Sequence, residues 1–155
     1  MKNFNKLFLG LTFLLASACT EEKQETSATS VLELARSSDG SIQVVARNFP
    51  ATSMAAQFEV VVESDDTFVV GETGAVSDLA LDSIKAAAAG VNRTRVFVGD
   101  KRGLMLKQNG AIAKFRLQRT ADGQASARVK LEASKVADAT GNLVQVESGP
   151  SILVD

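Results

Sequence analysis

Apolar and polar side chains alternate at every second position along most of the chain after residue 30. In the run Met54–Glu63, for example, Phe58 and Val60 fall on one side of an extended backbone. Gln57 and Glu59 fall on the other side. Such alternation is typical of β-strands with one buried face. Because short sequences rich in Gly, Asp, Asn and Ser separate the runs, we expect antiparallel strands joined by tight turns.

The alternating runs predict nine strands. In chain order they are Val31–Arg36, Ser41–Arg47, Met54–Glu63, Thr67–Val70, Thr94–Val98, Ala111–Gln118, Ala125–Ala133, Leu143–Glu147 and Ser151–Val154. Strands this short and this numerous close best as two packed sheets, because each sheet then buries its apolar face against the other. The pattern therefore predicts an all-β domain, a nine-stranded antiparallel β-sandwich, over residues 31–155.

The period changes between the fourth and fifth predicted strands, at Ser77–Gly90. Ser77 is a favourable N-cap, a run of alanines follows, and Gly90 is a typical stop residue. This segment predicts one short helix of about three turns, about 11 residues at 3.6 per turn. The buried stripe of the helix would consist of Leu79, Leu81 and Ile84.

The first 18 residues have the parts of a secretory signal peptide. Lys2 and Lys6 precede an apolar run over Leu7–Leu15, and a stretch of small residues begins at Ala16. The apolar run is much shorter than the roughly 20 residues that span a bilayer, so a permanent transmembrane helix is the weaker alternative.

The only cysteine of the chain, Cys19, directly follows this segment in "LASAC". The stretch resembles the lipobox of bacterial lipoproteins, in which small residues precede a cysteine that becomes the lipidated N-terminus. The resemblance implies that Cys19 carries a lipid anchor, since two or three acyl chains hold a protein durably at a membrane. The alternative is an ordinary cleavage site followed by a small residue.

The segment after the cysteine is rich in Glu, Ser and Thr and has no hydrophobic period. Such a composition cannot bury enough apolar surface to offset its ordering entropy, so we predict a flexible tether over residues 19–30. Thr20, and not an aspartate, follows Cys19. In many Gram-negative bacteria this favours the outer membrane, so we expect a lipid-anchored protein of the bacterial cell envelope.

Composition excludes several classes of function. The chain has no histidine and one cysteine, so it cannot build a Ser-His-Asp or Cys-His arrangement or the usual zinc sites. The formal net charge is −1, and it becomes −3 once Lys2 and Lys6 leave with the signal peptide, so nucleic acid is not an expected partner. Asp65 and Asp66 are better explained by a solvated turn than by catalysis. We therefore predict a protein that is not an enzyme, with no cofactor and no metal.

Weaker motifs leave further alternatives. Asn92–Thr94 matches a glycosylation sequon. Asp138 and Asn142 could hold calcium, although a hydrogen-bonded turn around Gly141 explains them better. The absence of Trp and Tyr counts against a carbohydrate-binding face without excluding a glycan ligand.

The stretch "GDKRGLMLKQNG" places three large apolar side chains in a predicted loop. Alternation puts Leu104 and Leu106 on one side and Met105 on the other. We expect Leu104 or Leu106 to pack over the end of the sandwich and Met105 to be more exposed. The loop would then either cap the core or contact a partner.

The order of the predicted elements resembles that of a cohesin domain, the β-sandwich module with jelly-roll topology that binds dockerin modules in cellulosomes. Three stretches carry the resemblance: "AAQFEVVVESDD", "RVFVGDKRGLMLKQNGAIAKFRL" and "LEASKVADATGNLVQVESGPSILV". The third is similar to the closing pattern of that family, a strand, a short turn with Asp and Gly, a strand, Gly and a final strand.

In cohesins the dockerin binds the outer face of the sheet formed by strands eight, three, six and five. With the predicted strands counted in order, the resemblance implies a partner-binding face of Leu143, Gln145, Gln57, Glu59, Val61, Ile112, Lys114, Arg116, Arg95 and Phe97. It also implies a partner-binding loop of Leu104, Met105 and Leu106 at the rim. An ordinary solvated sheet face with a few tolerated apolar residues is the alternative.

Three functions are compatible with these features. The first is a membrane-anchored lipoprotein whose cohesin-like domain is a non-catalytic protein–protein interaction module for a dockerin-like or other envelope protein. The second is a sandwich that binds a glycan or another ligand of the cell envelope through its loops. The third is a structural lipoprotein of the envelope with no discrete ligand.

Overall fold

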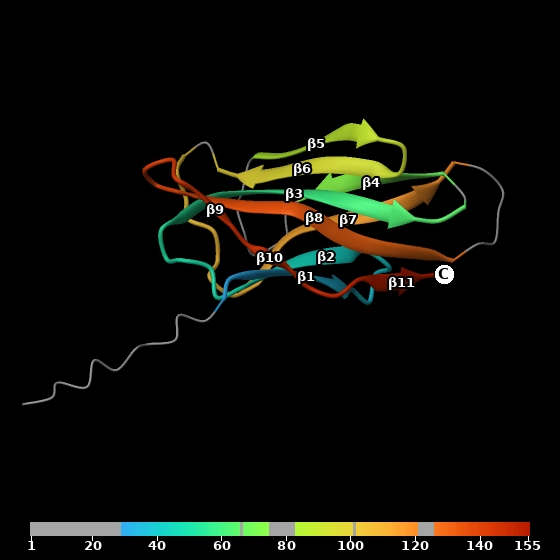
Figure 1. Ribbon diagram of the computed structural model, residues 1–155, viewed down its shortest axis with the longest axis horizontal. Helices are drawn as coiled ribbons and strands as arrows, with labels where there is room; N and C mark the ends of the chain where they lie inside the picture. Colours follow the sequence, from blue (N-terminus) through green and yellow to red (C-terminus); the bar gives the residue numbers. More distant parts are fainter. Residues whose placement is uncertain (1–28, 66, 75–82, 101, 121–125) are drawn as a thin grey trace, which may run out of the picture.

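A computed structural model of the protein shows two β-sheets packed face to face (Figure 1). The structure describes residues 29–155 except 66, 75–82, 101 and 121–125. Within these ranges every regular element is a strand, which confirms the predicted all-β sandwich. The described part contains eleven strands instead of the predicted nine.

The first sheet, which we call the β1 sheet, has the strand order β10-β1-β2-β7-β4. Its members are β1 (Val31–Arg36), β2 (Ile42–Arg47), β4 (Phe68–Gly74), β7 (Gly110–Arg119) and β10 (Glu147–Ser148). Neighbouring strands are antiparallel except for β1 and β10, which run parallel.

The second sheet, which we call the β3 sheet, has the order β11-β8-β3-β6-β5, with β9 also paired to β8. Its members are β3 (Ser53–Glu63), β5 (Ser83–Gly90), β6 (Arg93–Gly99), β8 (Ala127–Asp138), β9 (Leu143–Gln145) and β11 (Ile152–Val154). All of these pairs are antiparallel.

The hydrophobic core fills the space between the two sheets. Phe58 and Val60 of β3 belong to the same buried cluster as Val44 of β2 and Phe115 of β7. Each of the four side chains is at most 2% exposed. Their alternation in sequence is what aims them at the opposite sheet, as expected for two packed sheets. A smaller buried cluster consists of Val62, Phe68 and Ala127.

The predicted helix is wrong in the part that the structure describes, because Ser83–Gly90 forms strand β5. This strand pairs with β6, with Ile84 opposite Val98 and packed against the core. Alanine gains at most about 0.7 kcal/mol over ordinary residues in a helix, and sheet pairing overrides so weak a preference. Ser77, Leu79 and Leu81 lie outside the described residues.

The predicted strand Leu143–Glu147 is two short strands in different sheets. β9 pairs with β8, whereas β10 pairs with β1. Between them Val146 is 4% exposed and donates its backbone N–H to the carbonyl oxygen of Ser134 over 3.1 Å. The chain therefore changes from one sheet to the other at Val146.

Strand β7 departs from the predicted alternation at Ile112. This residue was expected on the outer face, but it is fully buried. Val44 pairs with Ala113 and Val45 pairs with Ala111, so Ile112 is the extra residue of a β-bulge. A bulge shifts the phase of a strand by one residue, and Ile112 and Ala113 are therefore both buried.

Candidate functional site

The outer face of the β3 sheet is the surface on which outward side chains of β3, β5, β6, β8 and β9 lie together. We call it the β3 face. The pairing register sets these side chains in rows across the sheet. Glu59, for example, lies opposite Arg95 on β6 and Glu132 on β8. A bulge in β8 at Ala133 keeps Glu132 and Lys135 in register with β3 on either side of it.

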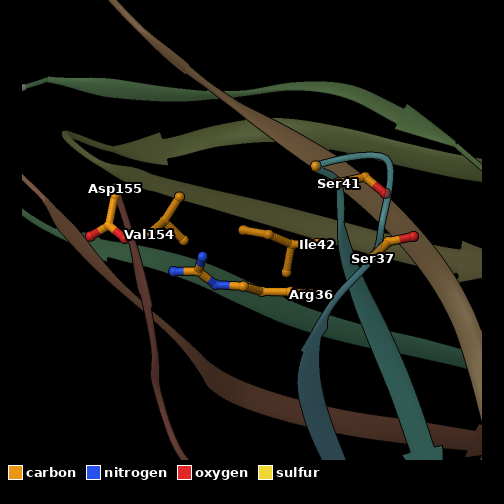
Figure 2. A pocket seen from close by; sticks show the side chains of 7 residues that line it. Arg36, Ser37, Ser41, Ile42, Val154 and Asp155 are labelled. Carbon is orange, nitrogen blue, oxygen red and sulfur yellow. The ribbon is translucent and has the colours of Figure 1, made fainter.

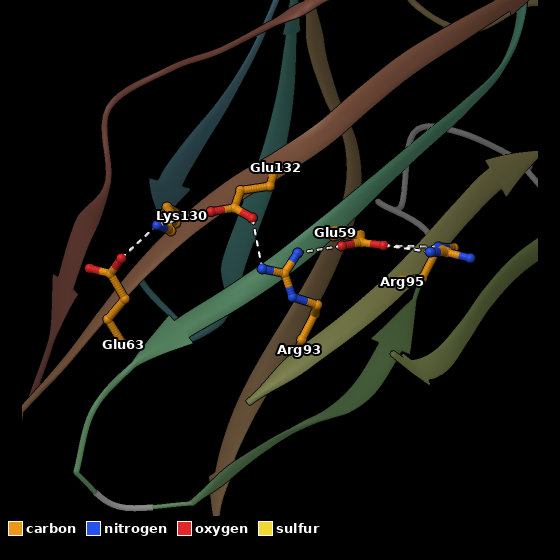
Figure 3. Close-up of polar contacts among 6 residues, drawn as sticks. All are labelled: Glu59, Glu63, Arg93, Arg95, Lys130 and Glu132. Atoms are coloured by element: carbon orange, nitrogen blue, oxygen red, sulfur yellow. Dashed lines mark hydrogen bonds and ion pairs between the residues drawn. The ribbon is translucent and has the colours of Figure 1, made fainter. Parts of the chain in front are cut away.

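Part of this face is covered by charged side chains that alternate in sign (Figure 3). Glu59 is at the centre, and its side chain is only 9% exposed. Its Oε2 lies 2.5 Å from Nη1 of Arg93, and its Oε1 lies 2.6 Å from Nη2 of Arg95. Hydrogen bonds from Arg93 and Arg95 hold the pKa of Glu59 below its usual value and offset the cost of covering a carboxylate.

The same chain of charges continues onto β8. Arg93 also contacts Glu132, with Nη2 2.8 Å from Oε2. Lys130 then joins two carboxylates, because its Nζ lies 2.9 Å from Oε1 of Glu132 and 2.6 Å from Oε1 of Glu63. Lys130 and Arg93 together lower the pKa of Glu132. We call these six residues the charge network, and its three cations and three carboxylates cancel: Glu59, Glu63, Arg93, Arg95, Lys130 and Glu132.

A shallow apolar hollow lies beside the charge network. Its volume is 60 Å³, which is room for a single small group. Phe97 of β6 and Leu143 of β9 contribute its large apolar side chains, and both are exposed, by 42% and 67%. Ala55 and Ala137 face each other across β3 and β8 and leave the space open because their side chains are small. The remaining lining residues are Ala56, Gln57 and Lys135.

The loop after β6 adds apolar surface near this hollow, since Gly99 at the end of β6 pairs with Ala55. Leu104 is 45% and Met105 is 56% exposed, whereas Leu106 is 3% exposed. The backbone N–H of Leu106 donates to the carbonyl oxygen of Ser53 over 2.8 Å and anchors the loop to β3. The prediction that Leu104 or Leu106 packs while Met105 is more exposed is confirmed, and Leu106 is the residue that packs. The prediction that Leu106 contacts a partner is wrong, because its side chain is part of the core.

The structure brings seven of the ten predicted face residues together on the β3 sheet. They are Gln57, Glu59, Val61, Arg95, Phe97, Leu143 and Gln145. Ile112, Lys114 and Arg116 do not join them, because β7 belongs to the β1 sheet. Lys114 and Arg116 lie on the opposite side of the molecule, beside Asp39, and Ile112 is in the core.

This error follows from the missed strand. The helix predicted at Ser77–Gly90 makes Ala111–Gln118 the sixth strand, whereas the sixth strand of the structure is Arg93–Gly99. The eighth strand likewise shifts to Ala127–Asp138. The predicted face therefore lacks the outward residues of β8 and one residue each of β5 and β6. The ones that matter for the site are Lys85, Arg93, Lys130, Glu132 and Lys135. Alternation within "RVKLE" is the signal that could have marked Lys130 and Glu132 as outward residues.

A second hollow of 210 Å³ lies between the β1–β2 turn and the last described residues (Figure 2). Ile42 and Val154 give it an apolar wall, and the guanidinium of Arg36 extends from β1 toward Val154. None of the described residues that line this hollow is aromatic.

The remaining sequence motifs form turns. The carboxylate of Asp138 accepts hydrogen bonds from the backbone N–H groups of Thr140 and Asn142, at 2.8 and 3.0 Å. A hydrogen-bonded turn is thus present where calcium was the alternative. Oδ1 of Asn92 accepts a hydrogen bond from the backbone N–H of Phe68 over 2.7 Å, so the sequon residue has a structural contact.

In the described part of the chain no three His, Cys, Asp or Glu side chains gather as metal ligands. No helix in these residues has the length and apolar character to cross a bilayer.

No family model and no curated protein matches this chain. Solved structures of cohesin domains do match it. The sixth cohesin of scaffoldin B from Acetivibrio cellulolyticus, in complex with a Cel5 dockerin mutant, has a TM-score of 0.62 at 14% identity, over 82% of this chain and 98% of that one. A non-cellulosomal cohesin from the archaeon Archaeoglobus fulgidus has a TM-score of 0.56 at 15% identity, over 77% of this chain and 86% of that one.

A third match is the Coh-OlpA–Doc918 complex from Clostridium thermocellum, a type I cohesin–dockerin complex. Its TM-score is 0.56 at 18% identity, over 77% of this chain and 93% of that one. At such low identity the likeness concerns the fold. It confirms the resemblance drawn from the sequence: the chain has the β-sandwich fold of a cohesin domain.

Proposed function

We propose that this chain is a lipid-anchored, non-catalytic interaction module that binds a protein through the β3 face. The partner is a dockerin-like module or another protein of the cell envelope. The observation that carries the proposal is the apolar hollow between Phe97 and Leu143, on a face whose neighbouring charges already neutralise one another. The fold supports it, because two of the similar cohesins are in complex with dockerins.

The distribution of exposed apolar side chains favours one end of this face. Phe97 and Leu143 line the hollow, and Leu104 and Met105 lie in the loop that leaves β6 next to it. Exposed apolar residues that gather on one surface are typical of protein-binding sites, whereas scattered ones are ordinary. The charge network then forms a polar border along one side of this apolar centre, as interfaces commonly have.

Binding of purified dockerin modules and of solubilised envelope proteins tests the β3 face. The test variants are Phe97→Asp and Leu143→Asp. The matched control is Val69→Asp on the outer face of the β1 sheet, because Val69 is 44% exposed and Phe97 42%. We expect each test variant to lower the affinity for the partner by at least about 10-fold and the control to change it by less than about 2-fold.

Equal affinity of the test variants and the control would contradict the proposed face. Retention of the chain on glycan columns, with no protein bound at any face, would contradict protein binding and support the second function. Thermal unfolding of each variant confirms that a loss of binding is not a loss of folding.

The anchor is tested at Cys19. In the producing cell, the wild-type chain should carry fatty acyl groups and fractionate with the outer membrane. Cys19→Ala should carry none and appear in the soluble fraction, since lipidation requires the thiol. A Cys19→Ala protein that remains in the membrane fraction would contradict the lipid anchor.

A further inference from the structure

The row of the β3 face that crosses the apolar hollow has a distinctive composition. Gln57 of β3 pairs with Phe97 of β6 and with Lys135 of β8. Phe97 in turn pairs with Lys85 of β5. The row therefore reads Lys135, Gln57, Phe97 and Lys85, with an aromatic ring and an amide between two ammonium groups. Lys135 also lines the hollow itself.

These two lysines differ from the cations of the charge network. Every cation of the charge network has a carboxylate within 3 Å. Within the described residues, neither Lys85 nor Lys135 forms an ion pair, and both side chains are exposed. The hollow therefore lies in a locally positive part of a chain whose formal net charge is −1. Such a site favours a partner surface of opposite charge.

The spacing of the lysines sets the geometry of that surface. Adjacent strands are about 4.8 Å apart, so the backbones of Lys135 and Lys85, three strand intervals apart, are separated by about 14 Å. A helix rises about 1.5 Å per residue, so two residues seven apart are separated by about 10.5 Å. The length of the side chains spans the difference. On one helix face, the residue three or four positions further on lies between them.

We propose that the partner segment is an acidic amphipathic helix, in which one aliphatic side chain enters the hollow and carboxylates on both sides pair with Lys135 and Lys85. This inference rests on the proposed function of the β3 face and adds the chemistry of the partner. The expected pattern is an acidic residue, an aliphatic residue three or four positions later, and a second acidic residue at seven.

A display library tests this directly. The probe is a monomeric helical scaffold with one exposed helix randomised, and it is selected on the full chain and on the double variant Lys85→Glu/Lys135→Glu. We expect the pattern above among binders of the wild-type chain, and basic residues in its place among binders of the variant. The control Arg36→Glu/Lys114→Glu makes the same charge change on the β1 sheet.

Single clones give the decisive numbers. An acidic clone selected on the wild-type chain should lose at least about 10-fold in affinity on Lys85→Glu/Lys135→Glu and less than about 2-fold on the control. It should also bind more weakly at high salt, since exposed ion pairs are screened.

The outcomes separate this inference from the proposed function. Clones that depend on Leu143 but show no acidic pattern and no effect of lysine reversal would overturn the acidic helix and leave the β3 face in place. Clones that bind equally well to Leu143→Asp would overturn both. Acidic clones that depend on the lysines but not on Leu143 would overturn the role of the hollow.

Discussion

Ala133 has a backbone conformation that suits glycine better than alanine. Its φ is 50°, and among the described non-glycine residues only Asn48 and Asn92 share a positive value. Asparagine tolerates this region, whereas the Cβ of alanine crowds its own carbonyl. The strain occurs at the β8 bulge, and this bulge keeps both Glu132 and Lys135 on the β3 face.

Ala133→Gly should therefore stabilise the domain by about 1 kcal/mol, because it removes that crowding. Ala139→Gly is the matched control, since Ala139 is also exposed but has no positive φ. It should lower stability slightly, through the extra entropy of an unfolded glycine. Urea unfolding measures both, and a loss of stability in Ala133→Gly would contradict the strained bulge.

A second prediction at the residue scale concerns the stability that Glu59 contributes and its dependence on pH. Because Arg93 and Arg95 lower its pKa, the carboxylate stabilises the folded state at pH values above the ordinary glutamate pKa. That contribution is lost as the pH falls through the lowered pKa of the folded state. Glu59→Gln should cost about 1 kcal/mol at neutral pH, and the difference from wild type should shrink below the ordinary value of 4.5. Urea unfolding at pH 7, 5 and 3 checks this, and a difference that grows in acid would contradict it.

At the scale of elements, β5 is the one that its sequence describes least well. The segment "SIKAAAAG" has only Ile84 as a large apolar residue, so no period-two pattern is visible. Its strand conformation comes from pairing with β6, from Ser83 opposite Gly99 to Gly90 opposite Arg93. A local pattern describes one segment and not its pairing, even with the next strand along the chain, and the alanine run favours a helix, which is why a helix was predicted.

Ala87→Thr tests whether this segment is a strand, because the substitution changes stability in opposite directions in a strand and in a helix. Ala87 is exposed and lies opposite Arg95. In a strand, threonine should stabilise by a few tenths of a kcal/mol, up to about 0.5, whereas in a helix it would destabilise by a similar amount. The control Ala139→Thr lies in a turn and should give no gain. A destabilised Ala87→Thr would contradict the strand.

The sequence predicted most of the other elements, because their apolar residues alternate and face a single core. Strands β1, β2, β3 and β6 were expected within two residues of their actual bounds. The candidate site was predicted only in part. Its residues on β3 and β6 followed from alternation. The prediction placed β7 on this face wrongly, because the strand count on which it rested omitted β5. The hollow could not be predicted, since it arises from the meeting of Phe97, Ala137 and Leu143 across three strands.

At the scale of the whole molecule, the segment after β8 joins the two sheets. It pairs with β8 through β9, turns inward at Val146, and pairs with β1 through β10. The hydroxyls of Ser134 and Ser148, 3.1 Å apart, add a contact between β8 and β10. Because this crossing is part of the core and not a surface strap, we expect the two sheets to unfold as one cooperative unit.

Val146→Asp is the sharpest test of that coupling. It places a carboxylate at a position that is 4% exposed, which should cost at least about 3 kcal/mol. Val144→Asp, two residues earlier and 48% exposed, should cost less than about 1 kcal/mol. Hydrogen exchange then distinguishes the two views of the crossing. If the sheets are coupled, Val146→Asp lowers the protection of β1 and β8 together, whereas loss confined to β9 and β10 would show that the segment merely covers a sandwich that is stable without it.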